Sequence, residues 1–101
     1  MYLVQFLLPV YDNNQHHFPT AMYEAVFHQL AEQFGGVTAY QRAPARGAWK
    51  DEGEVSYDDV IVFEVMVEQL DRKWWAKYRR ELEQQFAQEE ILARATTYEK
   101  L

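Results

Sequence analysis

Three polar residues stand in the middle of otherwise apolar stretches, and they are the first candidates for chemistry in this chain. Gln5 lies within YLVQFLLPVY, Glu64 within VIVFEVMV and Arg94 within EILARATTY. A buried glutamate needs a partner, and a guanidinium can bind a carboxylate through two hydrogen bonds. Two interpretations stay open. The cluster fixes the register of an interface, or it is a ligand site in which Arg94 holds a carboxylate or Glu64 acts as a base.

A second candidate group lies in the segment PARGAWKDEG. Arg46, Trp49 and Lys50 could clamp an anion or carboxylate beneath an aromatic lid. The alternative is a basic hairpin tip whose tryptophan packs across a dimer. Loops of this kind commonly carry function, so both interpretations are kept.

Metal and nucleophile chemistry are not expected. His16 and His17 are adjacent and point in different directions in extended chain, and no HExxH spacing is present. The chain has no cysteine, and Ser56 is its only serine. No phosphate-binding glycine loop or nucleophile elbow appears, so we predict no metal and no cofactor, and the sequence leaves open whether the protein is an enzyme.

Six predicted elements must position these residues. Apolar runs and alternation predict strands at 2–11, 37–43, 55–68 and 90–98, with a loop at 44–53. A helical period predicts helices at 19–34 and from the Asp71 cap to about Gln88. The order β-α-β-β-α-β predicts one α+β domain, residues 1–101, with the ferredoxin-like fold. Its antiparallel sheet would have strand order 4-1-3-2 and both helices on one face.

Alternation along the strands assigns side chains to the two faces of this sheet. The face toward the helices is uniformly apolar, and the opposite face is about half apolar. The opposite face holds Leu3, Gln5, Leu7, Thr38, Tyr40, Arg42, Val60, Val62, Glu64, Met66, Leu92, Arg94, Thr96 and Tyr98. An exposed patch of that kind usually has a partner. We predict a homodimer, sheet against sheet, with a barrel-like core between the two copies. Tyr40 and Arg42 join the candidate ligand-binding residues.

The segment KWWAKYRREL contains two adjacent tryptophans. Trp75 falls inside the apolar stripe of the second helix, and Trp74 lies at its edge. We expect Trp74 to be a half-buried rim residue, or else the wall of a pocket or a helix contact in the dimer. Basic residues crowd the first half of this helix, which the helix dipole does not favour. A solvated charged face explains them, and an anion near the helix start is the alternative.

Composition narrows the range of partners. The net charge is −6, from 10 basic and 16 acidic residues. An acidic surface disfavours nucleic acid and anionic membranes. The apolar start of the chain is too short to span a bilayer and has no basic leader, so a cytoplasmic location is expected.

Two stretches carry a resemblance. FGGVTAYQRAPARGAWK (34–50) and the run from Asp58 to Ala95 resemble a family of small uncharacterised bacterial proteins. At the level of the fold, the pattern is similar to the dimeric α/β-barrel superfamily, which includes cofactor-free monooxygenases, muconolactone isomerases and haem-binding degraders. Activities do not transfer with a fold, and no motif here matches the catalytic residues of those enzymes.

The residues and the resemblance together favour one hypothesis about function. We expect a small homodimer that binds a small anionic or aromatic metabolite, or acts on it without a metal. The alternative is a non-catalytic assembly or regulatory module whose sheet face is only an interface.

Overall fold

The chain folds into six elements in the expected order. The computed structural model describes residues 1–48 and 55–101, with side chains outside 43–58. The elements are β1 (Tyr2–Pro9), α1 (Thr20–Phe34), β2 (Thr38–Ala48), β3 (Val55–Val67), α2 (Arg72–Gln85) and β4 (Ala93–Thr97). The four strands form one sheet in the order β2-β3-β1-β4, with every neighbouring pair antiparallel. This is the predicted order 4-1-3-2 counted from the other edge, so the ferredoxin-like α+β fold is confirmed.

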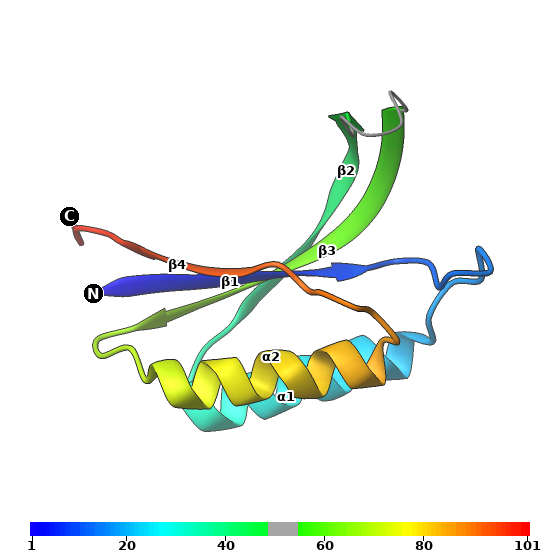
Figure 1. Ribbon diagram of the computed structural model, residues 1–101. Coiled ribbons are helices and arrows are strands. Elements are labelled where there is room, and N and C mark those ends of the chain that lie inside the picture. The colour runs from blue at the N-terminus through cyan, green and yellow to red at the C-terminus, as the bar shows by residue number, and fades with distance from the viewer. Residues whose placement is uncertain (49–54) are drawn as a thin grey trace.

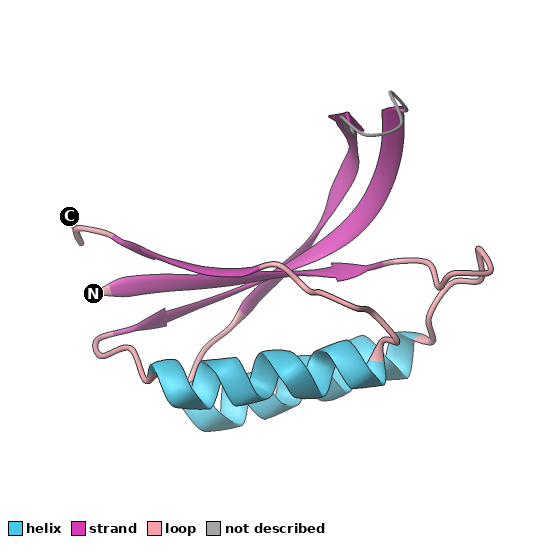
Figure 2. Cartoon of the chain, viewed as in Figure 1, coloured by secondary structure: helices cyan, strands magenta, loops and turns pink. Residues whose placement is uncertain are grey.

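The two helices form one layer beneath the sheet and leave its other face without a covering layer (Figure 2). We call this second face the open face. The β2–β3 hairpin continues past the end of β1 and curves away from the helices, so the open face is concave (Figure 1). Among the described residues, no helix is long and apolar enough to cross a bilayer.

The core lies between the sheet and the helix layer. Along β1, buried residues alternate with half-buried ones, and Val4, Phe6 and Leu8 point toward the helices. Phe6 lies at the centre, because its ring stacks on Phe63 with centroids 5.4 Å apart and meets Tyr78 edge-on at 6.0 Å. The face assignment made from alternation is therefore confirmed for the side that carries the core.

Helix α1 ends at the predicted glycine pair, but one of its stripe residues is more exposed than expected. Gly35 has φ 80°, and its N–H donates to the carbonyl of Ala31 at 2.8 Å, as in a left-handed cap. The helical period places Phe27 on one face with Tyr23, Val26, Leu30 and Phe34, yet Phe27 is 39% exposed. The buried residues are Tyr23, Val26 and Leu30, and Phe27 lies about 70° around the helix from their centre, at 100° per residue.

Helix α2 ends earlier than the predicted Gln88, at a cap that contains no glycine. Ala87 has φ 50°, the N–H of Ala87 donates to Gln84, and the N–H of Gln88 donates to Glu83 at 2.8 Å. These are the two hydrogen bonds of a Schellman motif, with alanine in its left-handed position. Alanine gives no stop signal in a sequence, so the helical pattern was extended too far.

The Ala87→Gly variant is expected to raise the free energy of unfolding by about 0.5–1 kcal/mol, because glycine adopts a positive φ without steric cost. Urea unfolding followed by circular dichroism measures the change. The control is Ala25→Gly on an exposed position inside α1, which should lower stability by a similar amount. A loss of stability in both variants would contradict the assignment of the cap.

The strand boundaries differ from the prediction at the two edges of the sheet. Strand β2 includes residues 44–48, which are expected in a loop from the sequence, and residues 45–48 pair with the start of β3. The register shifts between Arg42 and Ala45, so a bulge accommodates Pro44, which lacks an N–H. Strand β4 is shorter than residues 90–98, because Ile91 turns into the core with 3% exposure before the ladder begins at Ala93.

Candidate functional site

The three polar residues identified in the sequence form a line across the open face. In the sheet register, Gln5 on β1 lies opposite Glu64 on β3 and opposite Arg94 on β4. Side chains directly opposite one another in an antiparallel sheet point to the same face. Gln5, Glu64 and Arg94 thus lie on adjacent strands and on the same face of the sheet, as the sequence predicts.

Hydrogen bonds join these residues to a fourth. Glu64 Oε1 accepts a hydrogen bond from Gln5 Nε2 at 2.7 Å and another from the hydroxyl of Tyr40 at 2.7 Å. Arg94 Nε donates to Gln5 Oε1 at 3.0 Å. We call these four residues, Tyr40, Glu64, Gln5 and Arg94, the polar row. It runs over β2, β3, β1 and β4, so every strand of the sheet contributes one member.

Arg94 and Glu64 are connected through Gln5. The sequence offers Arg94 as a possible direct partner of the Glu64 carboxylate, but Gln5 lies between them and binds both. The reason is the strand order, since β1 separates β3 from β4. Two strand spacings place the backbones of Glu64 and Arg94 roughly 9–10 Å apart. The amide of Gln5 can donate to one residue and accept from the other, so it relays the contact.

Electrostatics keep Tyr40 protonated. Its hydrogen bond to Glu64, followed by burial and the nearby carboxylate charge, raises the pKa of the Tyr40 hydroxyl, while the charges of Arg42 and Arg94 oppose the rise. At neutral pH the hydroxyl therefore donates to Glu64 and leaves the carboxylate as the acceptor. The sequence placed Tyr40 on this face but could not show this bond, because the bulge in β2 hides the register of that strand.

The polar row is surrounded by apolar side chains of unequal exposure. Val62 is only 2% exposed although it points to the open face, and Leu3 and Leu7 are half-buried. By contrast Met66 is 64% exposed and Leu92 is 50% exposed. The concave centre of the open face is therefore partly shielded from solvent even in a single chain. Apolar surface is exposed at the Met66 end of β3 and beside β4, at Leu92.

The remaining candidate residues do not all reach this site. Arg42 lies on β2 two residues from Tyr40, on the same face, and its charge acts on the Tyr40 hydroxyl. Arg46 lies farther along β2, beyond the bulge, where its backbone is opposite Tyr57. Trp49 and Lys50 lie outside the described residues, so the predicted clamp of Arg46, Trp49 and Lys50 remains a prediction.

Trp74 lies in the helix layer and not at the polar row. Its ring is half-buried, stacks on Tyr78 with centroids 5.0 Å apart, and meets Phe34 of α1 edge-on at 5.0 Å. Because the sheet lies between the helix layer and the open face, Trp74 cannot line the same site as Glu64. This position fits the interpretation of Trp74 as a half-buried rim residue of the core. If Trp74 forms the wall of a pocket, that pocket is not on the open face.

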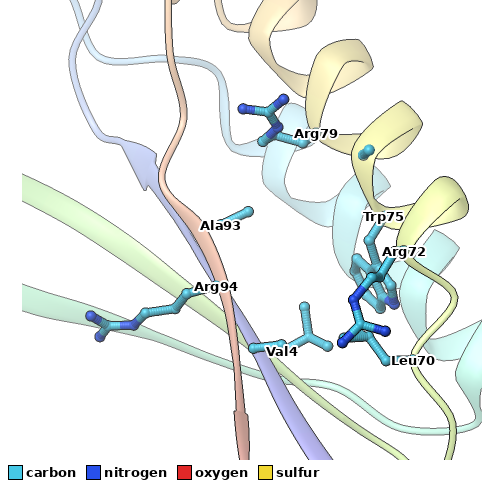
Figure 3. A pocket seen from close by; sticks show the side chains of 9 residues that line it. Val4, Leu70, Arg72, Trp75, Arg79, Ala93 and Arg94 are labelled. Atoms are coloured by element: carbon cyan, nitrogen blue, oxygen red, sulfur yellow. The ribbon is translucent and has the colours of Figure 1, made fainter.

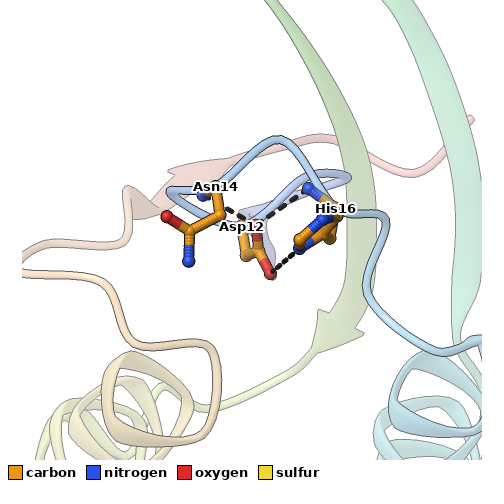
Figure 4. A network of polar contacts seen from close by, with 3 residues as sticks. All are labelled: Asp12, Asn14 and His16. Atoms are coloured by element: carbon orange, nitrogen blue, oxygen red, sulfur yellow. Dashed lines mark hydrogen bonds and ion pairs between the residues drawn. The ribbon is translucent and has the colours of Figure 1, made fainter.

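Hydrogen bonds to the Asp12 side chain shape the loop after β1. Asp12 Oδ1 accepts hydrogen bonds from the backbone N–H groups of Asn14 and His16 at 2.8 and 2.9 Å (Figure 4). These bonds, with the His16 contact largest, lower the pKa of Asp12. His16 itself is exposed. Within the described parts of the chain, no three His, Asp or Glu side chains cluster as metal ligands.

Comparisons with known proteins add information at the level of the fold. A phage SAM lyase in complex with S-methyl-5'-thioadenosine has a TM-score of 0.63 at 10% identity, covering 94% of this chain and 79% of the lyase chain. A phage SAM lyase in the apo state has a TM-score of 0.58 at 11% identity, covering 94% and 78%. No family model and no curated protein matches the chain. The similarity therefore shows a shared fold, and the resemblance to a family of small bacterial proteins remains a prediction.

Proposed function

We propose that this chain is a homodimeric protein that binds, or acts without a metal on, a small anionic or aromatic metabolite at its open face. The observation that carries the proposal is the polar row, a connected set of four polar side chains in the middle of an otherwise largely apolar sheet surface. Pockets for small molecules are typically apolar with a few convergent polar groups, and this surface has that composition.

The charges around the polar row favour an anionic group on the ligand. Glu64 contributes one negative charge, and it is engaged by Gln5 and Tyr40. Arg94 and Arg42 contribute two positive charges near the same hydroxyl. Where side chains are described, neither arginine forms an ion pair with a protein carboxylate. A local excess of positive charge on a chain of net charge −6 is suited to a carboxylate ligand.

The same row offers a base if the protein is an enzyme. Glu64 accepts a hydrogen bond from the Tyr40 hydroxyl. A ligand group that replaced this hydroxyl, or lay next to it, would be within hydrogen-bond reach of the Glu64 carboxylate, which could take a proton from it. Arg94 and Arg42 could stabilise negative charge that forms on the ligand. The row thus contains the elements of proton abstraction beside a bound anion, on rigid strands rather than on loops.

A second copy of the chain is part of the proposal. Met66, Leu92 and Tyr40 present apolar or aromatic surface on the open face, with 64%, 50% and 44% exposure. Burial of such surface favours association, at about 25 cal/mol per Å². A two-fold partner would cover the concave face and exclude water from the polar row, which strengthens electrostatic contacts there.

The structural neighbours suggest which compounds to try first. One neighbour is a SAM lyase bound to S-methyl-5'-thioadenosine. S-adenosylmethionine carries both a carboxylate and an aromatic base, the two features that the open face would bind. We therefore place S-adenosylmethionine and S-methyl-5'-thioadenosine at the head of a panel of carboxylate and aromatic metabolites.

Thermal shift and isothermal titration on the full chain test the proposal. A ligand at 100 times its dissociation constant adds about 2.7 kcal/mol, enough to raise the melting temperature by roughly 11–22 °C in a domain of this size. The Arg94→Gln variant should bind the same compound at least about tenfold more weakly, since it removes a charged hydrogen-bond donor. Arg80→Gln, an exposed position on α2 in the other layer, is the control with the same change of charge.

The alternative function is supported by the same hydrogen bonds. A polar row that crosses all four strands could simply fix the register of an interface between two copies. If no compound in the panel raises the melting temperature while the protein is a dimer, the assembly module is the better description. Unchanged binding in Arg94→Gln would also contradict the proposed site.

A further inference from the structure

A second hollow lies on the helix side of the sheet, between α2 and the edge strand β4. It has a volume of about 160 Å³, and its base is formed by Val4, Leu70 and Trp75. Figure 3 shows it between the helix and the strand, with Ala93 turned toward α2. We call it the α2–β4 groove. Arg94, a member of the polar row, also lines the groove, but the hydrogen bonds of the polar row lie on the other face of the sheet.

Three alanines create the groove. Ala93 and Ala95 of β4 face the helix layer and line the groove, and Ala76 lines it from α2. Their methyl groups are too short to close the gap, so both β4 alanines stay exposed on the side where the rest of the sheet is packed. Protein interiors are normally filled to crystal-like density, and larger residues here would stabilise the fold. The pattern Ala-x-Ala therefore leaves room that packing alone does not require.

Two arginines border this apolar base. Arg72 and Arg79 are seven residues apart, about two helical turns or roughly 10 Å along α2, and both side chains flank the groove (Figure 3). The guanidinium of Arg94 extends to the other side of β4, so it belongs to the polar row (Figure 3). The groove thus combines a small apolar cavity with two positive charges at its helix side.

The acidic neighbour of Arg79 is largely committed to another contact. Arg79 Nη1 lies 3.8 Å from Glu83 Oε2, beyond hydrogen-bond length. The same Glu83 oxygen accepts the backbone N–H of Ile91 at 2.9 Å, which ties the end of α2 to the chain leading into β4. Arg79 therefore keeps donors for another acceptor. Its position also gives a role to the basic residues that crowd the first half of α2 against the helix dipole.

We propose that the α2–β4 groove binds a small aromatic monocarboxylate, with its ring on Trp75 and the alanines and its carboxylate on Arg72 or Arg79. An engineered cavity of about 150 Å³ holds one benzene molecule, so a groove of about 160 Å³ matches a single aromatic ring. Guanidinium groups bind carboxylates through two parallel hydrogen bonds, which selects an acid over its neutral amide. This proposal goes beyond the open-face function and does not depend on it.

Benzoate is the probe, and benzamide is its neutral counterpart. In protein labelled at the alanine methyl carbons, benzoate should shift the signals of Ala76, Ala93 and Ala95 by its ring current and leave distant alanines unchanged. Isothermal titration should give benzoate at least about tenfold tighter binding than benzamide, the ratio expected for one charge-assisted hydrogen bond.

Variants separate the two sites. The double variant Arg72→Gln, Arg79→Gln should bind benzoate at least about tenfold more weakly. Ala95→Leu should abolish benzoate binding, because the larger side chain fills the groove. Arg80→Gln is the matched control, and it should bind as the natural sequence does. No shift at the three alanines, or binding that survives Ala95→Leu, overturns the proposal. Binding lost in Arg94→Gln but kept in Ala95→Leu would also overturn it and assign benzoate to the open face.

Discussion

Replacing Trp75 with alanine is expected to lower the free energy of unfolding by about 3–5 kcal/mol. The side chain is 9% exposed, and its ring stacks on Phe34 of α1 with centroids 4.9 Å apart and tilts against Phe6 of β1 at 6.4 Å. It therefore joins both helices to the sheet. Because small domains have only about 5–15 kcal/mol of stability, this single change should bring the protein close to unfolding.

Trp74→Ala is the matched comparison, since it removes the same side chain from the next position. Trp74 is half-buried and touches Phe34, Trp75 and Tyr78 from the edge of the layer. We expect a loss of about 1–2 kcal/mol. Urea unfolding monitored by circular dichroism measures both values. Equal losses in the two variants would show that the helical stripe had been assigned to the wrong tryptophan.

Replacing Met66 with arginine is expected to separate the proposed homodimer and leave each copy folded. Met66 is 64% exposed on the open face of one copy, so an arginine there has room and should change the stability of the monomer little. In a sheet-to-sheet dimer it would place an unpaired charge inside the interface. We expect the dissociation constant of the dimer to rise at least about 100-fold, or about 2.7 kcal/mol.

Sedimentation at micromolar concentration measures this effect. The natural sequence should sediment at twice the chain mass of 12.1 kDa, and Met66→Arg at 12.1 kDa. Gln33→Arg adds the same charge to an exposed position on α1, in the helix layer, and should remain a dimer. A natural sequence that sediments at 12.1 kDa, or a Met66→Arg dimer, would contradict the proposed interface.

The sequence predicted the fold well because its local signals agree with one another. Alternation in β1 separates Val4, Phe6 and Leu8 from the other face, and Gly35 ends α1 where a positive φ is required. These signals depend on neighbours a few residues away. The order of the six elements then leaves few topologies, and the ferredoxin-like arrangement is the one observed.

What the sequence did not predict depends on residues far apart in the chain. The contact of Glu64 with Gln5 rather than Arg94 follows from the strand order combined with side-chain length. The extension of β2 past Pro44 requires a bulge, which only the partner strand reveals. Ala87 adopts a left-handed conformation that glycine usually occupies. The residue type therefore gave no signal that the helix ends there.

The α2–β4 groove was also missed, although a signal was present. The alternation Ala-Arg-Ala-Thr in β4 places two alanines on the face toward the helices, where β1 and β3 place larger residues. Read together with the basic first half of α2, this pattern indicates a gap beside positive charge. It needed the packing of α2 against β4 to show that Ala76 and the two β4 alanines face one another.

The claim that the open face is a binding site rests most directly on the side chains of the polar row. Nitrogen-15 NMR of the protein, titrated with the strongest compound of the panel, observes the Nε2 protons of Gln5 and the Nε proton of Arg94. These protons are donated to Glu64 and to Gln5, respectively. We predict that both signals shift together and saturate at the affinity found by titration, with the Arg80 Nε signal unchanged. Signals of Gln5 and Arg94 that stay fixed while the compound binds elsewhere would contradict the account.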